Sequence, residues 1–144
     1  MSVSYTRLSE VQIERLESAA RDLPFVSLLG IKLESAEPGS AVMSLAVREE
    51  LKRDHGVVHG GAIATLMDTC TAFAIIPLLG EDEHSVTVDL TISYLRPLAT
   101  GTARASAKIL REGKRVIVLS AEVLDHEGKL AATALSTCLR IKNR

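Results

Sequence analysis

One segment of the sequence, HGGAIATLMDTCTAFAIIPLL at residues 59–79, is almost entirely apolar or small, and Asp68 is the only Asp, Glu, Lys or Arg within it. A run of this length and composition predicts a helix that is buried in the core of a domain. A membrane span is the other possibility, but Thr65, Thr69 and Pro77 interrupt it, and a central Asp costs roughly 2.5–3.5 kcal/mol on insertion. Since an ionised carboxylate buried without partners is also costly, we expect Asp68 to have a partner or a function.

Length and composition are those of one globular domain, which we assign to residues 1–144. Hydrophobic residues make up 47% of the chain and aromatic residues 3%, so the core is expected to be aliphatic. The formal net charge is −1 without a block of one sign, which argues against nucleic acid or an anionic membrane as partner. Cys70 and Cys138 lack metal-ligand spacing, and residues 1–10 lack a signal-peptide pattern, so we expect a cytoplasmic protein.

An amphipathic pattern precedes the apolar segment. Residues 8–22 carry apolar residues at helical spacing with charged residues between them, and Ser9 with Gln12 can form a capping box at the start. Pro24 is expected to end this helix, so residues 1–24 form an N-terminal helical segment of the domain.

Six strands are expected on the two sides of the apolar helix. Before it, residues 31–49 predict a hairpin that turns at Pro38 and Gly39. After it come four alternating segments: residues 85–95, 102–111, 116–124 and 130–141. In the first of these, one face is expected to hold Val86, Val88, Leu90, Ile92 and Tyr94, and the other Thr87, Asp89, Thr91 and Ser93. Without βαβ alternation, this order predicts an α+β fold in which a curved antiparallel sheet wraps around the apolar helix.

Small residues line one face of the predicted helix, and Asp68 is its only large member. The stripe consists of Gly61, Ala64, Thr65, Asp68, Thr71 and Ala72. At the helix start, the glycines of DHGVVHGG leave backbone N–H groups open, which could hold a polarised carbonyl oxygen. Asp68 lies roughly 10–13 Å further along the axis than Gly60, so both could act on one carbon only if two copies of the chain meet. We therefore expect a homo-oligomer, which an unprotected sheet edge also favours.

Together these motifs resemble the hotdog-fold acyl-CoA thioesterases of the phenylacetate-degradation (PaaI-like) type, from about residue 25 to residue 141. The motifs are the G-I-K strand start, G-x-x-H-G-G, an Asp nine residues after the His, VTVDLTISYLRP, and the turns R-E-G-K-R and D-x-E-G-K. The resemblance implies a hotdog fold, two copies joined edge to edge, and dimers that pair into tetramers. Each active site would lie at the dimer interface and would hydrolyse an acyl-CoA thioester to a free acid and CoA.

The resemblance also implies roles for individual residues. Gly60 would donate its backbone N–H to the thioester carbonyl, and His59 would fix the loop by hydrogen bonds. Asp68 of the other subunit would act as general base or nucleophile, and Thr87 would hold the water. The residues that lie where related proteins contact the nucleotide end of CoA are Arg96, Arg111, Gly113, Lys114 and Arg115. No metal and no cofactor would be needed, because CoA arrives as part of the substrate.

The loop before the helix departs from the family pattern at one position. Arg53 stands six residues before His59, where many relatives have an Asn that positions the substrate carbonyl. We expect Arg53 to contact the pantetheine or the phosphates instead, unless the loop is shifted by one residue. Gly61, at the end of the same loop, is also expected to bind the substrate.

Other interpretations of these residues stay open at this point. Asp68 could be a structural residue bonded across an interface, Thr87 an ordinary strand residue, and the EGKR turn a solvated hairpin tip. His55 and His59 are four residues apart, but no third ligand is evident, so no metal site is predicted. The same scaffold could be a catalytically silent acyl-CoA-binding protein or an acyl-thioester dehydratase. Thioester hydrolysis is the leading hypothesis of the three.

Overall fold

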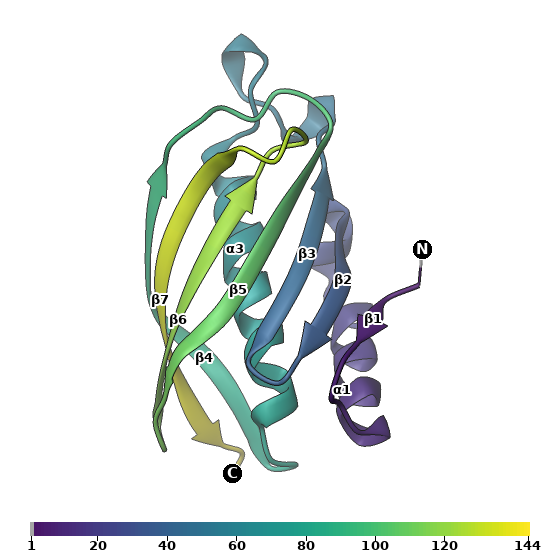
Figure 1. Cartoon of the computed structure of the whole chain (residues 1–144), viewed down its shortest axis with the longest axis vertical. Helices are drawn as coiled ribbons and strands as arrows, with labels where there is room; N and C mark the ends of the chain where they lie inside the picture. The colour runs from purple at the N-terminus through teal and green to yellow at the C-terminus, as the bar shows by residue number, and fades with distance from the viewer. Residues whose placement is uncertain (1) are drawn as a thin grey trace.

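A computed structural model describes residues 2–144, and in it the apolar segment forms helix α3 (Gly60–Ile75) and the 3-10 turn η3 (Ile76–Leu78). One seven-stranded sheet curves around this helix in the order β1-β2-β3-β5-β6-β7-β4 (Figure 1). The strands are β1 (Ser4–Tyr5), β2 (Ile31–Glu37), β3 (Ser40–Ala46), β4 (Glu83–Tyr94), β5 (Thr102–Glu112), β6 (Val116–Leu124) and β7 (Leu130–Lys142). All neighbouring strands are antiparallel except β1 and β2. The predicted α+β architecture is confirmed.

The N-terminal segment forms two helices, α1 (Glu10–Arg21) and α2 (Pro24–Leu29). The predicted capping box is confirmed: Ser9 Oγ accepts from the backbone N–H of Gln12 at 3.3 Å, and Gln12 Oε1 accepts from the backbone N–H of Ser9 at 2.9 Å. The predicted helix does end before Pro24, since α1 ends at Arg21, but the helical segment continues beyond residue 24, because Pro24 is the first residue of α2. A proline is tolerated there since the first residue of a helix needs no N–H donor.

Two side chains of α1 attach this helix to the far end of the central helix. Gln12 Nε2 donates to the carbonyl of Pro77 at 2.7 Å, and the Arg15 guanidinium donates to the carbonyl of Leu79. Two further 3-10 turns, η1 (Glu49–Leu51) and η2 (Asp54–Gly56), lead into the start of α3. The two ends of α3 therefore have different neighbours: the polar loop at its beginning and helix α1 at its end.

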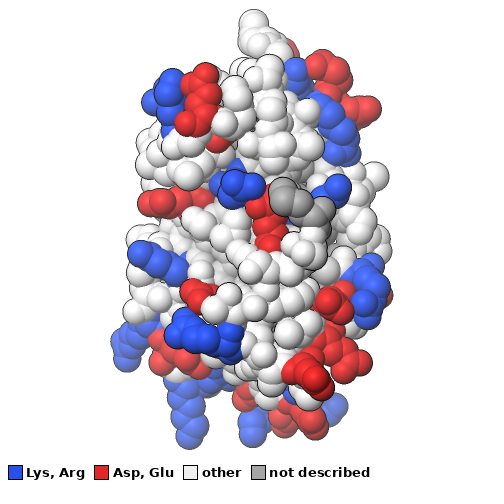
Figure 2. Space-filling view, turned by 45° about the vertical axis from the view of Figure 1, so that its right-hand side comes forward, with Lys and Arg blue, Asp and Glu red and all other residues white. Residues whose placement is uncertain are grey.

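Charged side chains of both signs are mixed over the surface. On the face drawn in Figure 2, Lys and Arg alternate with Asp and Glu, and no broad area of one sign is visible. Many of them are tied in exposed ion pairs, such as Arg104 with Glu34 at 2.7 Å and Arg7 with Glu37 at 3.0 Å.

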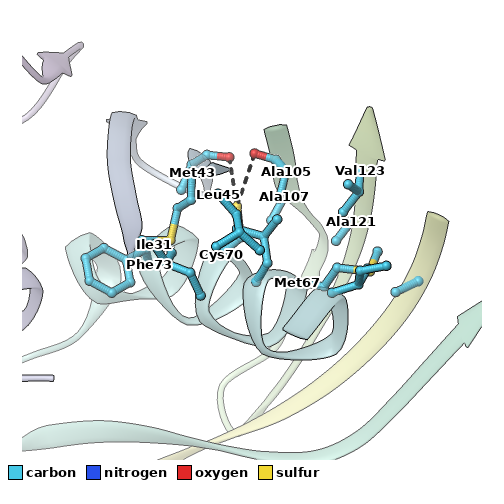
Figure 3. Close-up of a cluster of buried hydrophobic side chains, with 14 of the residues drawn as sticks. Ile31, Met43, Leu45, Met67, Cys70, Phe73, Ala105, Ala107, Ala121 and Val123 are labelled. Atoms are coloured by element: carbon cyan, nitrogen blue, oxygen red, sulfur yellow. Dashed lines mark hydrogen bonds between the residues drawn. The ribbon is translucent and has the colours of Figure 1, made fainter. Parts of the chain in front are cut away.

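The core lies between α3 and the concave face of the sheet (Figure 3). Alternate residues of three central strands point into it, as the sequence pattern predicted: Ala41, Met43 and Leu45 of β3, Ala103, Ala105 and Ala107 of β5, and Ile117, Leu119, Ala121 and Val123 of β6. From α3, Cys70 enters this layer, with its Sγ 3.4 Å from the carbonyl oxygen of Ala41 and 3.6 Å from that of Ala105. Burial raises the pKa of the Cys70 thiol to about 12.

Strand β4 contains a β-bulge that the sequence pattern did not predict. Thr87 pairs with Cys138 and Asp89 with Thr137, so Val88 is the extra residue. An extra residue in a strand turns the side chains of all residues beyond it to the opposite face of the sheet. The prediction of one continuous apolar face is therefore wrong: Thr87 points toward α3 together with Leu90, Ile92 and Tyr94, because their partners on β7 (Cys138, Ser136, Ala134 and Ala132) are buried.

β4 is also an open edge of the sheet, since it pairs only with β7 among the described strands. Its 12 residues present apolar side chains to solvent, with Val86 37% and Val88 54% exposed. The opposite side of the sheet differs, because there β1 covers part of β2. A long edge with exposed apolar residues is a surface that natural proteins normally cover.

Candidate active site

The start of α3 leaves one backbone donor free. His59 is the N-cap residue, and its Nδ1 accepts from the backbone N–H of Gly61 at 2.8 Å, while its carbonyl accepts from Ala62 at 3.0 Å. The predicted loop-fixing bond of His59 is therefore present. An accepting Nδ1 carries no proton, so this nitrogen is committed to the helix cap. Within residues 2–144 nothing accepts from the N–H of Gly60, which points out of the helix end.

Tyr94 holds Gly60 in place and leaves little room for a side chain there. The Tyr94 hydroxyl donates to the carbonyl of Gly60 at 3.0 Å, and a Cβ on Gly60 would lie 3.3 Å from Tyr94 Cζ. Sequence reasoning assigned Tyr94 only to an alternating strand. Alternation places Tyr94 on one face with Leu90 and Ile92, and the structure keeps these three together. Its contact with the helix start depends on how β4 packs against α3, for which the sequence carries no local signal.

Asp68 and Thr87, predicted from separate parts of the chain, are brought together. Thr87 Oγ1 donates to Asp68 Oδ1 at 2.8 Å, and Asp68 is half-buried on the open side of α3. The predicted stripe is confirmed for Gly61, Ala64, Thr65, Asp68 and Ala72, none of which is fully buried. It is wrong for Thr71, which is completely buried and bonds back to the carbonyl of Asp68 at 2.8 Å.

Asp68 lines the wall of a cleft of about 550 Å³. The cleft runs between the second half of α3 and the beginning of β4, and α1 and α2 cover it from the other side. Its lining is mainly apolar: Ala19, Leu23, Val26, Ala72, Phe73, Ile76 and Leu79. Sequence reasoning did not anticipate this cleft, because it depends on where the N-terminal helices pack.

The loop that carries Arg53 is exposed at residues 53–56. Arg53 Nε donates to Asp54 Oδ1 at 2.6 Å, and this bond holds the pKa of the Asp54 carboxyl below its usual value. His55 Nε2 lies 3.4 Å from the other oxygen of the same carboxylate. His55 and His59 therefore have different partners, and in residues 2–144 no three His, Cys, Asp or Glu side chains form a metal-type cluster.

The residues predicted to contact CoA fall into two places. Lys114 and Arg115 line a second cleft of about 680 Å³, together with Glu83, Arg140, Ile141 and Lys142. Gly113 makes the turn beside it, where a Cβ would lie 2.5 Å from the carbonyl oxygen of Val116. Arg111 lies on the outer side of the sheet, paired with Val118. Arg96 lies at the opposite end, where its N–H donates to Ala131 at the start of β7.

Arg140 is the member of the second cleft that sequence reasoning missed. Its Nη2 donates to Glu112 Oε1 at 2.8 Å, and its Nε lies 3.6 Å from Glu83. Among the described residues this Nε is the only buried side-chain polar atom without a hydrogen-bond partner. Along β7, Arg140 is nine residues from Ala131, roughly 30 Å. Within one chain, Arg96 is therefore remote from Lys114 and Arg115.

Comparison with known proteins identifies the class. Residues 55–132 match the family model described as the thioesterase superfamily, and the chain belongs to this family. Its fold is the hotdog fold, and its class is that of hydrolases acting on thioester bonds.

Individual relatives agree with this assignment. Human acyl-coenzyme A thioesterase 13 is 30% identical over 135 residues, which cover 92% of this chain and 96% of that protein. The Escherichia coli acyl-coenzyme A thioesterase PaaI is 31% identical over 105 residues, 72% of this chain and 73% of that protein. The solved PaaI structure has a TM-score of 0.86 and covers 94% of this chain and 97% of its own. A conserved Pseudomonas aeruginosa protein of known structure is 34% identical with a TM-score of 0.79, covering 83% of this chain and 94% of its own.

Proposed function

We propose that this protein hydrolyses an acyl-CoA thioester to a free carboxylic acid and CoA, in a site shared by two copies of the chain. The observation that carries the proposal is the free N–H of Gly60 together with the Asp68–Thr87 pair, both on the open side of α3. The names of human acyl-coenzyme A thioesterase 13 and PaaI support the choice of substrate.

The two groups are too far apart within one chain. Eight residues of helix separate Gly60 from Asp68, or about 12 Å. If the exposed β4 edges of two copies pair antiparallel about a twofold axis, opposite ends of β4 become neighbours. Tyr94, which holds Gly60, is at one end of β4, and Ser85 lies toward the other, near Asp68. Such pairing would bring Gly60 of the partner subunit toward Asp68.

The chemistry requires one donor, one base and one water. Asp68 would take a proton from water, and the oxygen of this water would attack the thioester carbonyl carbon. The N–H of Gly60 would stabilise the resulting oxyanion, and the C–S bond would break to release CoA thiolate, which takes a proton. Thr87 occupies Oδ1 of Asp68, so Oδ2 is available for the water. Direct attack by the carboxylate, with hydrolysis of the resulting anhydride, uses the same arrangement.

The second cleft supports a place for the nucleotide end of CoA. Lys114, Arg115, Arg140 and Lys142 contribute four cations to its lining, against two carboxylates, that of Glu83 in the lining and that of Glu112, which pairs with Arg140. Lys and Arg side chains are the usual partners of phosphate groups. The same antiparallel pairing would bring Arg96 of the partner subunit toward this end of the sheet.

A pair of substitutions at Gly60 tests the role of its N–H. Gly60→Pro removes the N–H at the first helical position, where proline is tolerated. Gly60→Ala keeps the N–H but introduces the same Cβ beside Tyr94. We expect Gly60→Pro to lower kcat in a thiol-release assay by roughly 100-fold or more, far more than Gly60→Ala does. Equal losses in the two variants would contradict the proposed role.

A mixing experiment tests the shared site. Asp68→Asn and Gly60→Pro are each expected to be inactive, but a mixed dimer would contain one site with both residues intact. Co-refolding equal amounts should restore about a quarter of the wild-type activity. No recovery, with mixed dimers present, would contradict a shared site, because Asp68 and Gly60 of the same chain would then serve one site. Binding of acyl-CoA without turnover by the wild type would identify a silent binding protein instead.

A further inference from the structure

We infer that the cleft beside Asp68 holds the acyl chain and selects straight aliphatic acyl groups of medium length, about eight to ten carbons. This inference rests on the proposed function and adds the substrate class to it. The cleft is the trough between the second half of α3 and the first half of β4 that α1 and α2 cover.

The cleft begins at the reacting position, because Asp68 and Thr69 form one end of its lining. From there it follows α3 through Ala72 and Phe73 to Ile76. The opposite wall is β4, which is fixed beside Asp68 by the Thr87 bond and contributes Ser85, His84 and Glu83. A carbonyl held beside Asp68 would therefore direct its acyl chain along the cleft.

Two independent measures agree on the length of the cleft. Along α3, eight residues from Asp68 to Ile76 span roughly 12 Å. Along β4, four residues from Thr87 to Glu83 span roughly 13 Å. An extended alkyl chain advances roughly 1.3 Å per carbon, given single bonds of about 1.52 Å and tetrahedral angles. A chain of about eight to ten carbons matches this length.

The lining becomes polar where the cleft ends. Gly80 donates its N–H to Glu83 Oε2 at 2.8 Å, and Arg15 is held on the carbonyl of Leu79. Glu81 and His84 lie at the same end. Each additional methylene is stabilised only while it replaces water on an apolar wall, so chains that extend beyond Ile76 and Leu79 gain nothing from these charged groups.

A short or compact acyl group would leave much of this cleft unfilled. The apolar residues from the N-terminal helices, Ala19, Leu23 and Val26, contribute to the same lining as Ala72 and Ile76. An arylacetyl group would occupy the part beside Asp68 and Ala72 and would leave the distal walls without contacts. The length of the lining therefore favours an alkyl chain over a single ring.

The experiment measures thiol release from acetyl-, butyryl-, octanoyl-, decanoyl-, palmitoyl- and phenylacetyl-CoA. We expect kcat/KM for octanoyl- or decanoyl-CoA to exceed that for acetyl-CoA by at least about 30-fold, since full burial of one methylene alone gives roughly fourfold. Palmitoyl-CoA should show no further gain. A flat profile, or phenylacetyl-CoA as the best substrate, would overturn the inference.

Variants on two walls locate the chain. Ala72→Phe from α3 and Ala19→Phe from α1 each place a ring in the cleft about one turn or more beyond Asp68, a distance that acetyl does not reach. Each should lower the octanoyl-to-acetyl ratio of kcat/KM at least tenfold. Val11→Phe adds the same ring to an exposed position of α1 outside the cleft and should leave the ratio within about twofold.

The outcomes separate this inference from the proposed function. Thermal melting confirms that each variant is folded, and the acetyl-CoA rate serves as the internal reference. If the wild type hydrolyses acyl-CoAs in an Asp68-dependent manner but neither cleft variant changes the ratio, the chain lies elsewhere and the thioesterase assignment stands. If no acyl-CoA is hydrolysed, both fail.

Discussion

The two sides of α3 are made from the same kind of sequence but differ in what covers them. Leu66, Met67, Cys70 and Ala74 face the concave sheet and are sealed completely. Two residues before Cys70, Asp68 lies on the side that the sheet leaves open, where it bonds to Thr87. Both are ionisable groups in one apolar helix. The surrounding elements, not the helix sequence alone, therefore decide which of the two groups is sealed in the core and which lines a cleft.

The largest effect is expected for Asp68→Asn. This change removes the proposed base but keeps the shape of the side chain and a hydrogen bond from Thr87. We expect kcat to fall by about 10³-fold or more in a thiol-release assay, since a general base contributes roughly 10²–10⁴-fold. The melting temperature should change by only a few degrees, because a single partly exposed hydrogen bond contributes about 1 kcal/mol. If Asp68→Asn keeps an activity within tenfold of the wild type, Asp68 is not the base, and the open side of α3 has no chemical role that the sealed side lacks.

On the side of α3 that the sheet covers, we expect Cys70 not to react readily with thiol reagents in the native protein. A thiol with a pKa of about 12 is almost entirely protonated at pH 9, and only the thiolate reacts. We expect Cys70 to react with a thiol reagent at least roughly 100-fold more slowly in the native protein than in denaturant. Because Cys138 is buried too, the Cys70→Ala variant reports Cys138 by itself. Rapid labelling of native Cys70 at pH 8 would show that α3 is open on both sides.

Local sequence patterns correctly predicted most of the features that distinguish the two sides of α3. The apolar run located α3, and the three- and four-residue spacing placed Asp68 on its open stripe. Alternation predicted the inward residues of β3, β5 and β6. Each of these features depends on residues close in sequence, whose side-chain directions follow from the helical or strand period.

The errors occurred where long-range pairing decides the structure. The bulge at Val88 is set by the register between β4 and β7, and alternation within β4 alone cannot locate it. This error placed Thr87 and Tyr94 on opposite faces of β4, whereas both point toward α3. The cleft beside Asp68 depends on the packing of α1, which is fixed by contacts such as the one from Gln12 to Pro77, 65 residues apart. Neither feature has a local signal.

A smaller effect is expected at Thr87. A substitution there tests whether its hydrogen bond to Asp68 contributes to the proposed reaction. Thr87→Val keeps the shape but removes the hydroxyl, and we expect kcat to fall roughly tenfold, because hydrogen bonds to charged groups contribute about 1.5–3 kcal/mol when buried and less when exposed. Thr87→Ser keeps the hydroxyl and should remain within about threefold of the wild type. Equal rates for Thr87→Val and the wild type would make Thr87 an ordinary strand residue.

The smallest effect is expected at Lys114. This residue does not lie beside α3 but in the turn between β5 and β6. An exposed ion pair with a CoA phosphate contributes about 0.2–1 kcal/mol, so Lys114→Ala should raise KM by up to about fivefold and leave kcat nearly unchanged. Because salt screens exposed charges, the wild-type KM should rise with ionic strength more steeply than that of the variant. Lys129→Ala is a matched control, since Lys129 is an exposed lysine paired with Glu127 in another turn. If the two variants have the same KM, CoA does not reach the cleft that Lys114 lines, and the proposed contacts would be confined to α3, β4 and the partner subunit.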